Sequence, residues 1–136
     1  MGGAYPLRQC AVMDKEEQKH MDRVEEARRT LLALYGGSHS PLEESDPDFA
    51  AIKQRLVYGE LYAQEALDPV MRELILLAVA TTNQTMSEVK LHTCAALRSG
   101  ASPEAVKEAV YHCAPYIGLG KAEAAAAAVN EVLRTQ

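Results

Sequence analysis

The sequence lacks residues on which several protein classes depend. It contains no tryptophan, one phenylalanine and three cysteines among 136 residues. With so few aromatic side chains, there is little surface on which bases or sugars could stack. The cysteines, Cys10, Cys94 and Cys113, are odd in number and widely spaced, and no two of them form a C-x-x-C motif. This spacing argues against a disulfide framework, a structural zinc site and a thioredoxin-like redox motif, so we expect no bound metal.

A surplus of basic residues and long apolar runs are missing as well. The chain carries 14 lysines and arginines against 19 aspartates and glutamates, which gives a net charge of −5. Proteins that bind nucleic acids, or membranes electrostatically, need a basic surface. No apolar run approaches the roughly 20 residues that span a bilayer, and the first residues do not form the apolar stretch of a secretory signal. We therefore expect a cytoplasmic protein without nucleic-acid or membrane partners.

The residues that are present indicate one helical domain. A hydrophobic share of 48% and a charged share of 24% are typical of globular proteins, and the length suits one domain rather than two. Apolar periodicity, N-cap residues and glycine stop signals predict an all-α fold of about six helices. We expect a single domain over residues 14–136, preceded by a loose tail over residues 1–13.

Two consecutive helices form the predicted centre of this fold. Aspartate followed by proline at positions 68 and 69 predicts the start of a helix over residues 69–83, in which residues 74–80 are apolar on every side. A Thr-x-x-Glu capping box at residues 85–88 predicts the next helix, over residues 86–99. Because the connection is short, we expect an antiparallel hairpin. A helix without a polar face must be buried on all sides, if necessary by other subunits.

Titratable residues inside these apolar helices are the candidates for chemistry. Glu88 and His92 are four residues apart on one helix face, where a carboxylate could orient an imidazole for acid–base catalysis. The alternative is a core histidine paired with a surface acid. Glu73 shares the face expected to be buried, although it could simply begin its helix, where acids suit the dipole. Cys94 is two positions from His92 and faces elsewhere, which indicates a small core residue.

Three segments, in order, resemble the carboxymuconolactone decarboxylase family, which shares its fold with alkylhydroperoxidase D. Residues 67–74 match an L-D-x-x-x-R-E-L helix start, and His92 is followed four and eight residues later by alanine and glycine, as in the family. Residues 116–120 match a closing Y-x-G-x-P, except that glycine replaces the final proline. The resemblance covers roughly residues 48–134 and implies an alkylhydroperoxidase D-like fold.

The resemblance also bears on redox chemistry. In the alkylhydroperoxidase branch a C-x-x-C precedes the histidine, and the corresponding positions here hold Thr85 and Glu88. A peroxidase of that type needs a thiolate and a nearby resolving thiol, so dithiol chemistry is not expected. Cys94 and Cys113 could replace the missing pair only if their Cα atoms lay within about 7 Å of each other. The glutamate and the histidine of that branch are both retained.

By resemblance, the chain is expected to be a decarboxylase or proton-transfer enzyme that needs no cofactor. Its substrate would be a small carboxylated lactone or unsaturated acid. His92 would act as the acid or base, with Glu73 as its partner or proton relay and Glu88 near its ring. Tyr116 would donate a hydrogen bond to the substrate, and Arg72 would be a candidate for holding the substrate carboxylate.

Other hypotheses stay open beside this one. Arg98 is a second candidate for the carboxylate contact. The chain could instead be a non-catalytic oligomeric scaffold or binding module, or a peroxidase of the alkylhydroperoxidase type. An apolar helix and an alanine-rich surface over residues 124–128 predict a homo-oligomer. The resemblance implies that this oligomer is a trimer or a hexamer.

Overall fold

Every regular element that the structure describes is a helix. The computed structural model describes residues 14–37 and 42–136, so the expected tail at residues 1–13 lies outside them. The elements are α1 (Lys15–Tyr35), α2 (Leu42–Ser45), α3 (Pro47–Lys53), η1 (Gln54–Leu61), α4 (Pro69–Asn83), α5 (Met86–Arg98), α6 (Pro103–Tyr111), α7 (Ala114–Ile117) and α8 (Leu119–Arg134). The π-helix η1 continues α3, so that the described chain forms six longer helices and two of a single turn. The predicted all-α fold is confirmed.

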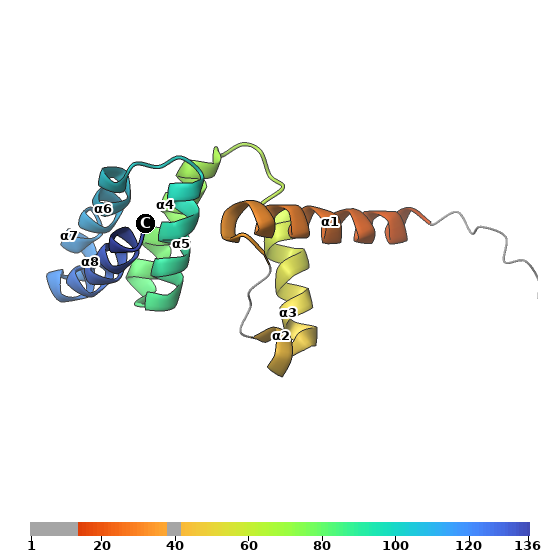
Figure 1. Cartoon of the computed structure of the whole chain (residues 1–136), viewed down its shortest axis with the longest axis horizontal. Helices are drawn as coiled ribbons and strands as arrows, with labels where there is room; N and C mark the ends of the chain where they lie inside the picture. The colour runs from red at the N-terminus through yellow and green to blue at the C-terminus, as the bar shows by residue number, and fades with distance from the viewer. Residues whose placement is uncertain (1–13, 38–41) are drawn as a thin grey trace, which may run out of the picture.

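The helices form two groups that meet at α5. Figure 1 shows α1, α2 and α3 on one side and the bundle of α4 to α8 on the other. The long helix α1 packs against η1 and also contacts α5, while α5 packs against α4 and α8. Among the described helices, none has both the length and the hydropathy needed to cross a membrane.

Helix α5 contributes to two separate clusters of buried apolar side chains. The first cluster joins α4, α5, α6 and α8, and its buried members are Leu77, Ala80, Val89, Ala96, Val106, Val110, Ala125, Ala128 and Val129. The second cluster joins α1, η1 and α5, and its buried members are Ala27, Leu31, Leu34, Tyr58, Tyr62 and Ala95. Ala96 belongs to the first cluster and the adjacent Ala95 to the second, so α5 packs against both.

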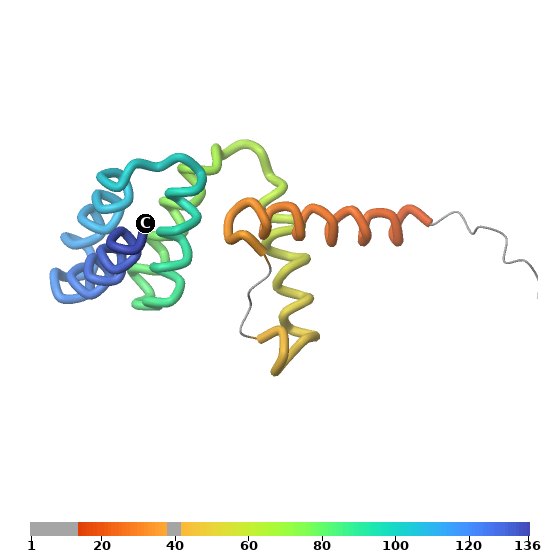
Figure 2. The backbone as a smooth tube through the Cα atoms, viewed as in Figure 1, coloured from red at the N-terminus to blue at the C-terminus, as the bar shows by residue number. Residues whose placement is uncertain are grey.

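The predicted hairpin is formed by α4 and α5, which run antiparallel side by side (Figure 2). Asp68 caps the N-terminus of α4 by accepting a hydrogen bond from the backbone of Met71 at 3.0 Å. The turn between the helices contains Gln84 in the left-handed conformation, with φ of 58°. Its side-chain amide donates to the carbonyl oxygens of Thr81 at 2.7 Å and Lys121 at 2.9 Å. These hydrogen bonds offset the strain of a left-handed residue that is not glycine.

The predicted capping box at the start of α5 is wrong. Thr85 is the N-cap residue, but its side chain makes no capping hydrogen bond. The physical reason is its backbone conformation: ψ is 85° at Thr85, compared with 157° at Asp68, where the cap forms. An extended N-cap residue turns its side chain back toward the first helical N–H groups.

A single chain does not bury α4 on all sides. Leu77 is fully buried, whereas Met71, Ile75 and Val79 are 46–50% exposed. Helices α5, α6 and α8 pack against α4, and together they cover only part of its circumference. Leu67, just before α4, continues this exposed row, which we call the α4 stripe (Leu67, Met71, Ile75 and Val79).

Gly59 allows η1 to approach α1 closely. A Cβ atom at Gly59 would lie 2.4 Å from the backbone oxygen of Arg23. No side chain fits at this distance unless the two helices move apart. The contact therefore fixes the position of η1, which carries Tyr58 and leads into Tyr62.

We predict that Gly59→Ala lowers the free energy of unfolding by about 1–3 kcal/mol, because it overpacks this contact. Gly120→Ala is the matched control, since a Cβ at Gly120 meets nothing within 4 Å and alanine favours the helical conformation of α8. Urea unfolding of both variants checks the prediction. Equal stability of the two variants would contradict it.

Candidate functional site

The α4–α5 hairpin brings Glu73 and His92 together in the interior. Glu73 Oε2 lies 2.9 Å from His92 Nδ1. The Glu73 side chain is fully buried and that of His92 is 11% exposed. A carboxylate that is removed from water needs such a partner, because an unpaired buried charge is strongly destabilising. The pair therefore holds the imidazole ring in a defined orientation, with Nδ1 toward α4.

The other ring nitrogen of His92 faces Glu88. Glu88 Oε2 lies 3.3 Å from His92 Nε2, and the two residues are four apart in α5. Unlike Glu73, Glu88 has a side chain that is 39% exposed. The imidazole thus lies between an inner carboxylate and an outer, partly hydrated one. In this position a proton on Nε2 can be exchanged with solvent through Glu88 or passed to a bound molecule.

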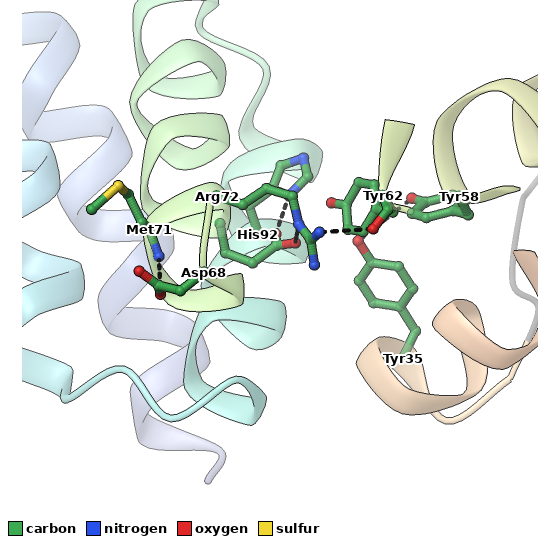
Figure 3. A network of polar contacts seen from close by, with 8 residues as sticks. Tyr35, Tyr58, Tyr62, Asp68, Met71, Arg72 and His92 are labelled. Carbon is green, nitrogen blue, oxygen red and sulfur yellow. Dashed lines mark hydrogen bonds and ion pairs between the residues drawn. The ribbon is translucent and has the colours of Figure 1, made fainter. Parts of the chain in front are cut away.

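Arg72 is held beside this pair by the segment after η1. Its Nη1 donates a hydrogen bond to the backbone oxygen of Tyr62 at 3.0 Å, and its guanidinium lies 4.1 Å from the centroid of the Tyr62 ring. Figure 3 shows the guanidinium of Arg72 pointing from α4 toward Tyr62. Arg72 Nε is 3.8 Å from Glu73 Oε1. These contacts combine a cation–π interaction with a charge pair.

A cavity of about 370 Å³ gives solvent-side access to the histidine. It lies between α3–η1, α4 and α5, and its lining residues are Lys53, Val57, Tyr58, Leu61, Tyr62, Leu67, Arg72, Ile75, Leu76, Glu88 and His92. We call it the His92 pocket. Its walls are mostly apolar, but they also include two cations, Lys53 and Arg72, and the Glu88–His92 pair. This combination and this volume suit a small organic ligand.

Three tyrosines in edge-to-face and tilted contact support the wall formed by η1. Ring centroids are 5.8 Å apart for Tyr35 and Tyr58 and 5.0 Å apart for Tyr58 and Tyr62. The Tyr58 hydroxyl donates to that of Tyr35 at 3.5 Å. Burial raises the pKa of all three phenols, and the nearby charge of Glu73 raises the pKa of Tyr62 further. The three hydroxyl groups are therefore neutral hydrogen-bonding groups at physiological pH.

The structure places most of the predicted site residues in or beside the His92 pocket. Glu88, His92 and Arg72 line it, and Glu73 lies directly behind His92. Tyr116 does not: it lies on α7, is 89% exposed and is not part of the pocket lining. The reason is that α7 packs on α8, whereas the pocket is bounded by α3–η1, α4 and α5. The catalytic roles of the predicted site residues stay predictions.

Arg98, the second candidate for the carboxylate contact, lies elsewhere. It ends α5, and its guanidinium lies next to Gly36 at the end of α1. Arg98 is not among the residues of the pocket lining. Of the two arginines considered from the sequence, Arg72 therefore is the one that a ligand in the pocket can reach.

Besides apolar side chains, sequence reasoning missed three polar residues of the pocket lining: Lys53, Tyr58 and Tyr62. The two tyrosines are four positions apart, which places them on one face of a helix and was an available signal. Lys53 carries no such signal, because a single lysine in an amphipathic helix is usually solvated. Its place in the pocket depends on how α3–η1 packs against the hairpin.

Among the described residues, the cysteines are not joined by a disulfide. Cys94 and Cys113 are both free, and Cys10 lies outside the described residues. Cys113 donates its S–H to the backbone oxygen of Ala109 at 3.3 Å, and burial raises the pKa of its thiol. A raised thiol pKa disfavours the reactive thiolate. Within residues 14–37 and 42–136, no group of three His, Cys, Asp or Glu side chains is arranged to hold a metal ion.

Comparison with known proteins adds two findings. The sequence profile of the carboxymuconolactone decarboxylase family matches residues 47–131, a segment that contains every residue of the pocket lining. A 4-carboxymuconolactone decarboxylase from Acinetobacter baylyi (strain ATCC 33305 / BD413 / ADP1) is 28% identical over 93 residues. That alignment covers 68% of this chain and 69% of the relative.

We predict that the tyrosine cluster weakens the fold at alkaline pH. Unfolded tyrosines titrate near pH 10, whereas the folded pKa values of Tyr35, Tyr58 and Tyr62 are higher. Their contribution to stability is complete below about pH 10 and is lost as the pH rises above it, because the unfolded state then binds fewer protons. Urea unfolding between about pH 8 and 11.5 should show this fall, and Tyr62→Phe should make it shallower. An unchanged slope in Tyr62→Phe would be inconsistent with the prediction.

Proposed function

The chain belongs to the carboxymuconolactone decarboxylase family, and we propose that it is a lyase that decarboxylates, or moves a proton on, a small carboxylated lactone or unsaturated acid without a cofactor. The observation that carries this proposal is the position of His92. Its ring is held by a buried carboxylate, 2.9 Å away, while its other nitrogen faces an outer carboxylate beside the pocket. This is an arrangement suited to proton transfer.

The composition of the pocket lining supports an anionic, partly apolar substrate. Lys53 and Arg72 are its two cations, and an arginine fork matches the geometry of a carboxylate. Apolar side chains such as Val57, Leu61 and Leu76 offer the remaining surface to an unsaturated ring. The volume of about 370 Å³ is at the small end of the range for ligand pockets.

The proposed reaction needs one proton and no redox partner. When the carbon–carboxylate bond breaks, carbon dioxide leaves and the electron pair enters the conjugated lactone, which becomes a dienolate. The cations of Lys53 and Arg72 stabilise the negative charge on the dienolate oxygen. Protonated His92 then delivers a proton from Nε2 to carbon. Glu88, which is partly exposed, returns a proton from water to the ring.

We also propose that the chain is a homo-oligomer, a trimer or a hexamer. The α4 stripe is an exposed apolar row, and Phe49, Ile52 and Leu56 on the α3–η1 helix are also 50–53% exposed. Contiguous apolar surface of this kind is typical of subunit interfaces. Leu67 and Ile75 belong both to the stripe and to the lining of the His92 pocket, so a second subunit there would narrow the entrance.

We predict that the molar mass of the protein in solution is that of a trimer or a hexamer of the 14.8 kDa chain. Val79→Glu should lower this mass, because it places a charge in the stripe at a position outside the pocket lining. Light scattering at micromolar concentration measures the molar mass of the wild type and of the Val79→Glu variant. A wild-type monomer would contradict the prediction.

We predict that His92→Gln lowers turnover at least about a hundredfold while the melting temperature stays nearly unchanged. The glutamine amide can still donate a hydrogen bond to Glu73, so the buried carboxylate keeps a partner, but glutamine cannot carry the proton. Carboxylated lactones and unsaturated acids labelled with ¹³C in the carboxyl group are assayed in D₂O for labelled carbon dioxide and for deuterium in the product. His112→Gln, which changes a histidine outside the pocket lining, is the matched control.

Two outcomes would contradict this prediction. If activity survives in His92→Gln, the proton is handled elsewhere. If the variant unfolds, His92 is a packing residue. Folded protein that turns over none of these acids would count against the proposed reaction itself.

A further inference from the structure

Glu73 Oε1 and two polar atoms of neighbouring side chains are buried without hydrogen-bond partners. Oε2 of Glu73 contacts the imidazole, but Oε1 is buried without a hydrogen-bond partner. Tyr62 Oη and Arg72 Nε are likewise buried and unpartnered in the described structure. A buried polar atom without a partner is costly and calls for an explanation. Arg72 lies between the other two residues: its Nε is 3.8 Å from Glu73 Oε1, and its guanidinium is 4.1 Å from the centroid of the Tyr62 ring.

Arg72 is not the natural partner of Glu73 Oε1. Its Nε lies 3.8 Å away, which is beyond hydrogen-bond distance. Nη1 of the guanidinium donates instead to the backbone oxygen of Tyr62, and the guanidinium lies over the Tyr62 ring. Those contacts hold Tyr62 on the same side of Glu73 as Arg72 itself.

We propose that the hydroxyl of Tyr62 donates a hydrogen bond to Oε1 of Glu73, so that Tyr62 positions the carboxylate that orients His92. Glu73 is fully buried, and its carboxylate oxygen is a hydrogen-bond acceptor. The phenol of Tyr62 carries a hydroxyl donor at the end of a rigid side chain. The hydroxyl keeps its proton at physiological pH, because burial and the charge of Glu73 raise the pKa of Tyr62. The result is a chain of hydrogen bonds from Tyr62 through Glu73 to His92.

This series of hydrogen bonds determines which ring nitrogen of His92 is available for proton transfer. With Oε1 occupied by Tyr62, Oε2 is left to accept from His92, which places the proton of the neutral ring on Nδ1. Nε2 is then free toward Glu88 and the pocket. Tyr62 is thus a positioning residue, and its effect on turnover rests on the proposed function. Its effect on the imidazole does not, since it concerns the protein without a substrate.

Histidine tautomers are read from long-range ¹H–¹⁵N correlation spectra, with the His92 signals assigned through His92→Gln. In the wild type we expect the neutral ring to be the Nδ1–H form. In Tyr62→Phe we expect the ratio of this form to the Nε2–H form to fall about tenfold, which corresponds to the loss of one hydrogen bond to a charged group. The matched control is Tyr35→Phe, which removes a hydroxyl of the same tyrosine cluster that bonds to Tyr58 rather than to Glu73. It should retain the wild-type ratio.

A second readout concerns turnover. With the substrate identified by the carbon dioxide assay, Tyr62→Phe should lower kcat about tenfold with little change in KM, and Tyr35→Phe should change neither. If no substrate is found, this counts against the proposed function, but the tautomer measurement still tests the role of Tyr62. An unchanged tautomer ratio in Tyr62→Phe would overturn the inference. Should that variant not fold, a crystal structure of the wild type decides, since Tyr62 Oη must then lie within about 3.0 Å of Glu73 Oε1.

Discussion

The register of the α4–α5 hairpin determines where each charged group of the pocket lies. Glu73 and His92 are 19 residues apart and meet only because the turn at Gln84 sets one helix against the other at this register. The Gln84 side chain ties the turn to Lys121 in α8, so the C-terminal helix also supports it. A shift by one residue would rotate either side chain by about 100° and separate the pair. The site therefore depends on the packing of the bundle.

The buried pair has an energetic consequence for function. Removing a carboxylate and its imidazole partner from water costs free energy that their attraction often fails to recover, and apolar replacements are frequently neutral or stabilising. A scaffold or binding module would have no need of Glu73 in the mostly apolar α4, fully buried against His92. An acid–base site does need it. Glu88 and the pocket lie at the other ring nitrogen, an arrangement that supports the proposed acid–base role of the pair.

The sequence was informative where spacing along one helix decides geometry. The Glu88–His92 distance follows from positions four apart, and the hairpin follows from two start signals and a short connection. Contacts between distant segments could not be predicted from the sequence: Lys53 lines the pocket together with residues of α4 and α5 that are far from it along the chain. Motif matching alone put Tyr116 at the site, whereas packing places it on the exposed α7. The proximity of Glu73 to His92 was predicted from the family resemblance and the expected antiparallel hairpin, and not from periodicity.

A double-mutant cycle tests most directly whether the pair is held for chemistry. The account predicts that His92→Leu alone lowers the free energy of unfolding by about 3–5 kcal/mol, because it leaves the Glu73 carboxylate buried and unpaired. The double variant Glu73→Leu/His92→Leu should recover wild-type stability to within about 1 kcal/mol and show no turnover. Urea unfolding followed by circular dichroism gives all four values. A double variant as unstable as the sum of the two single variants would show that the pair supports the fold, which would contradict the account.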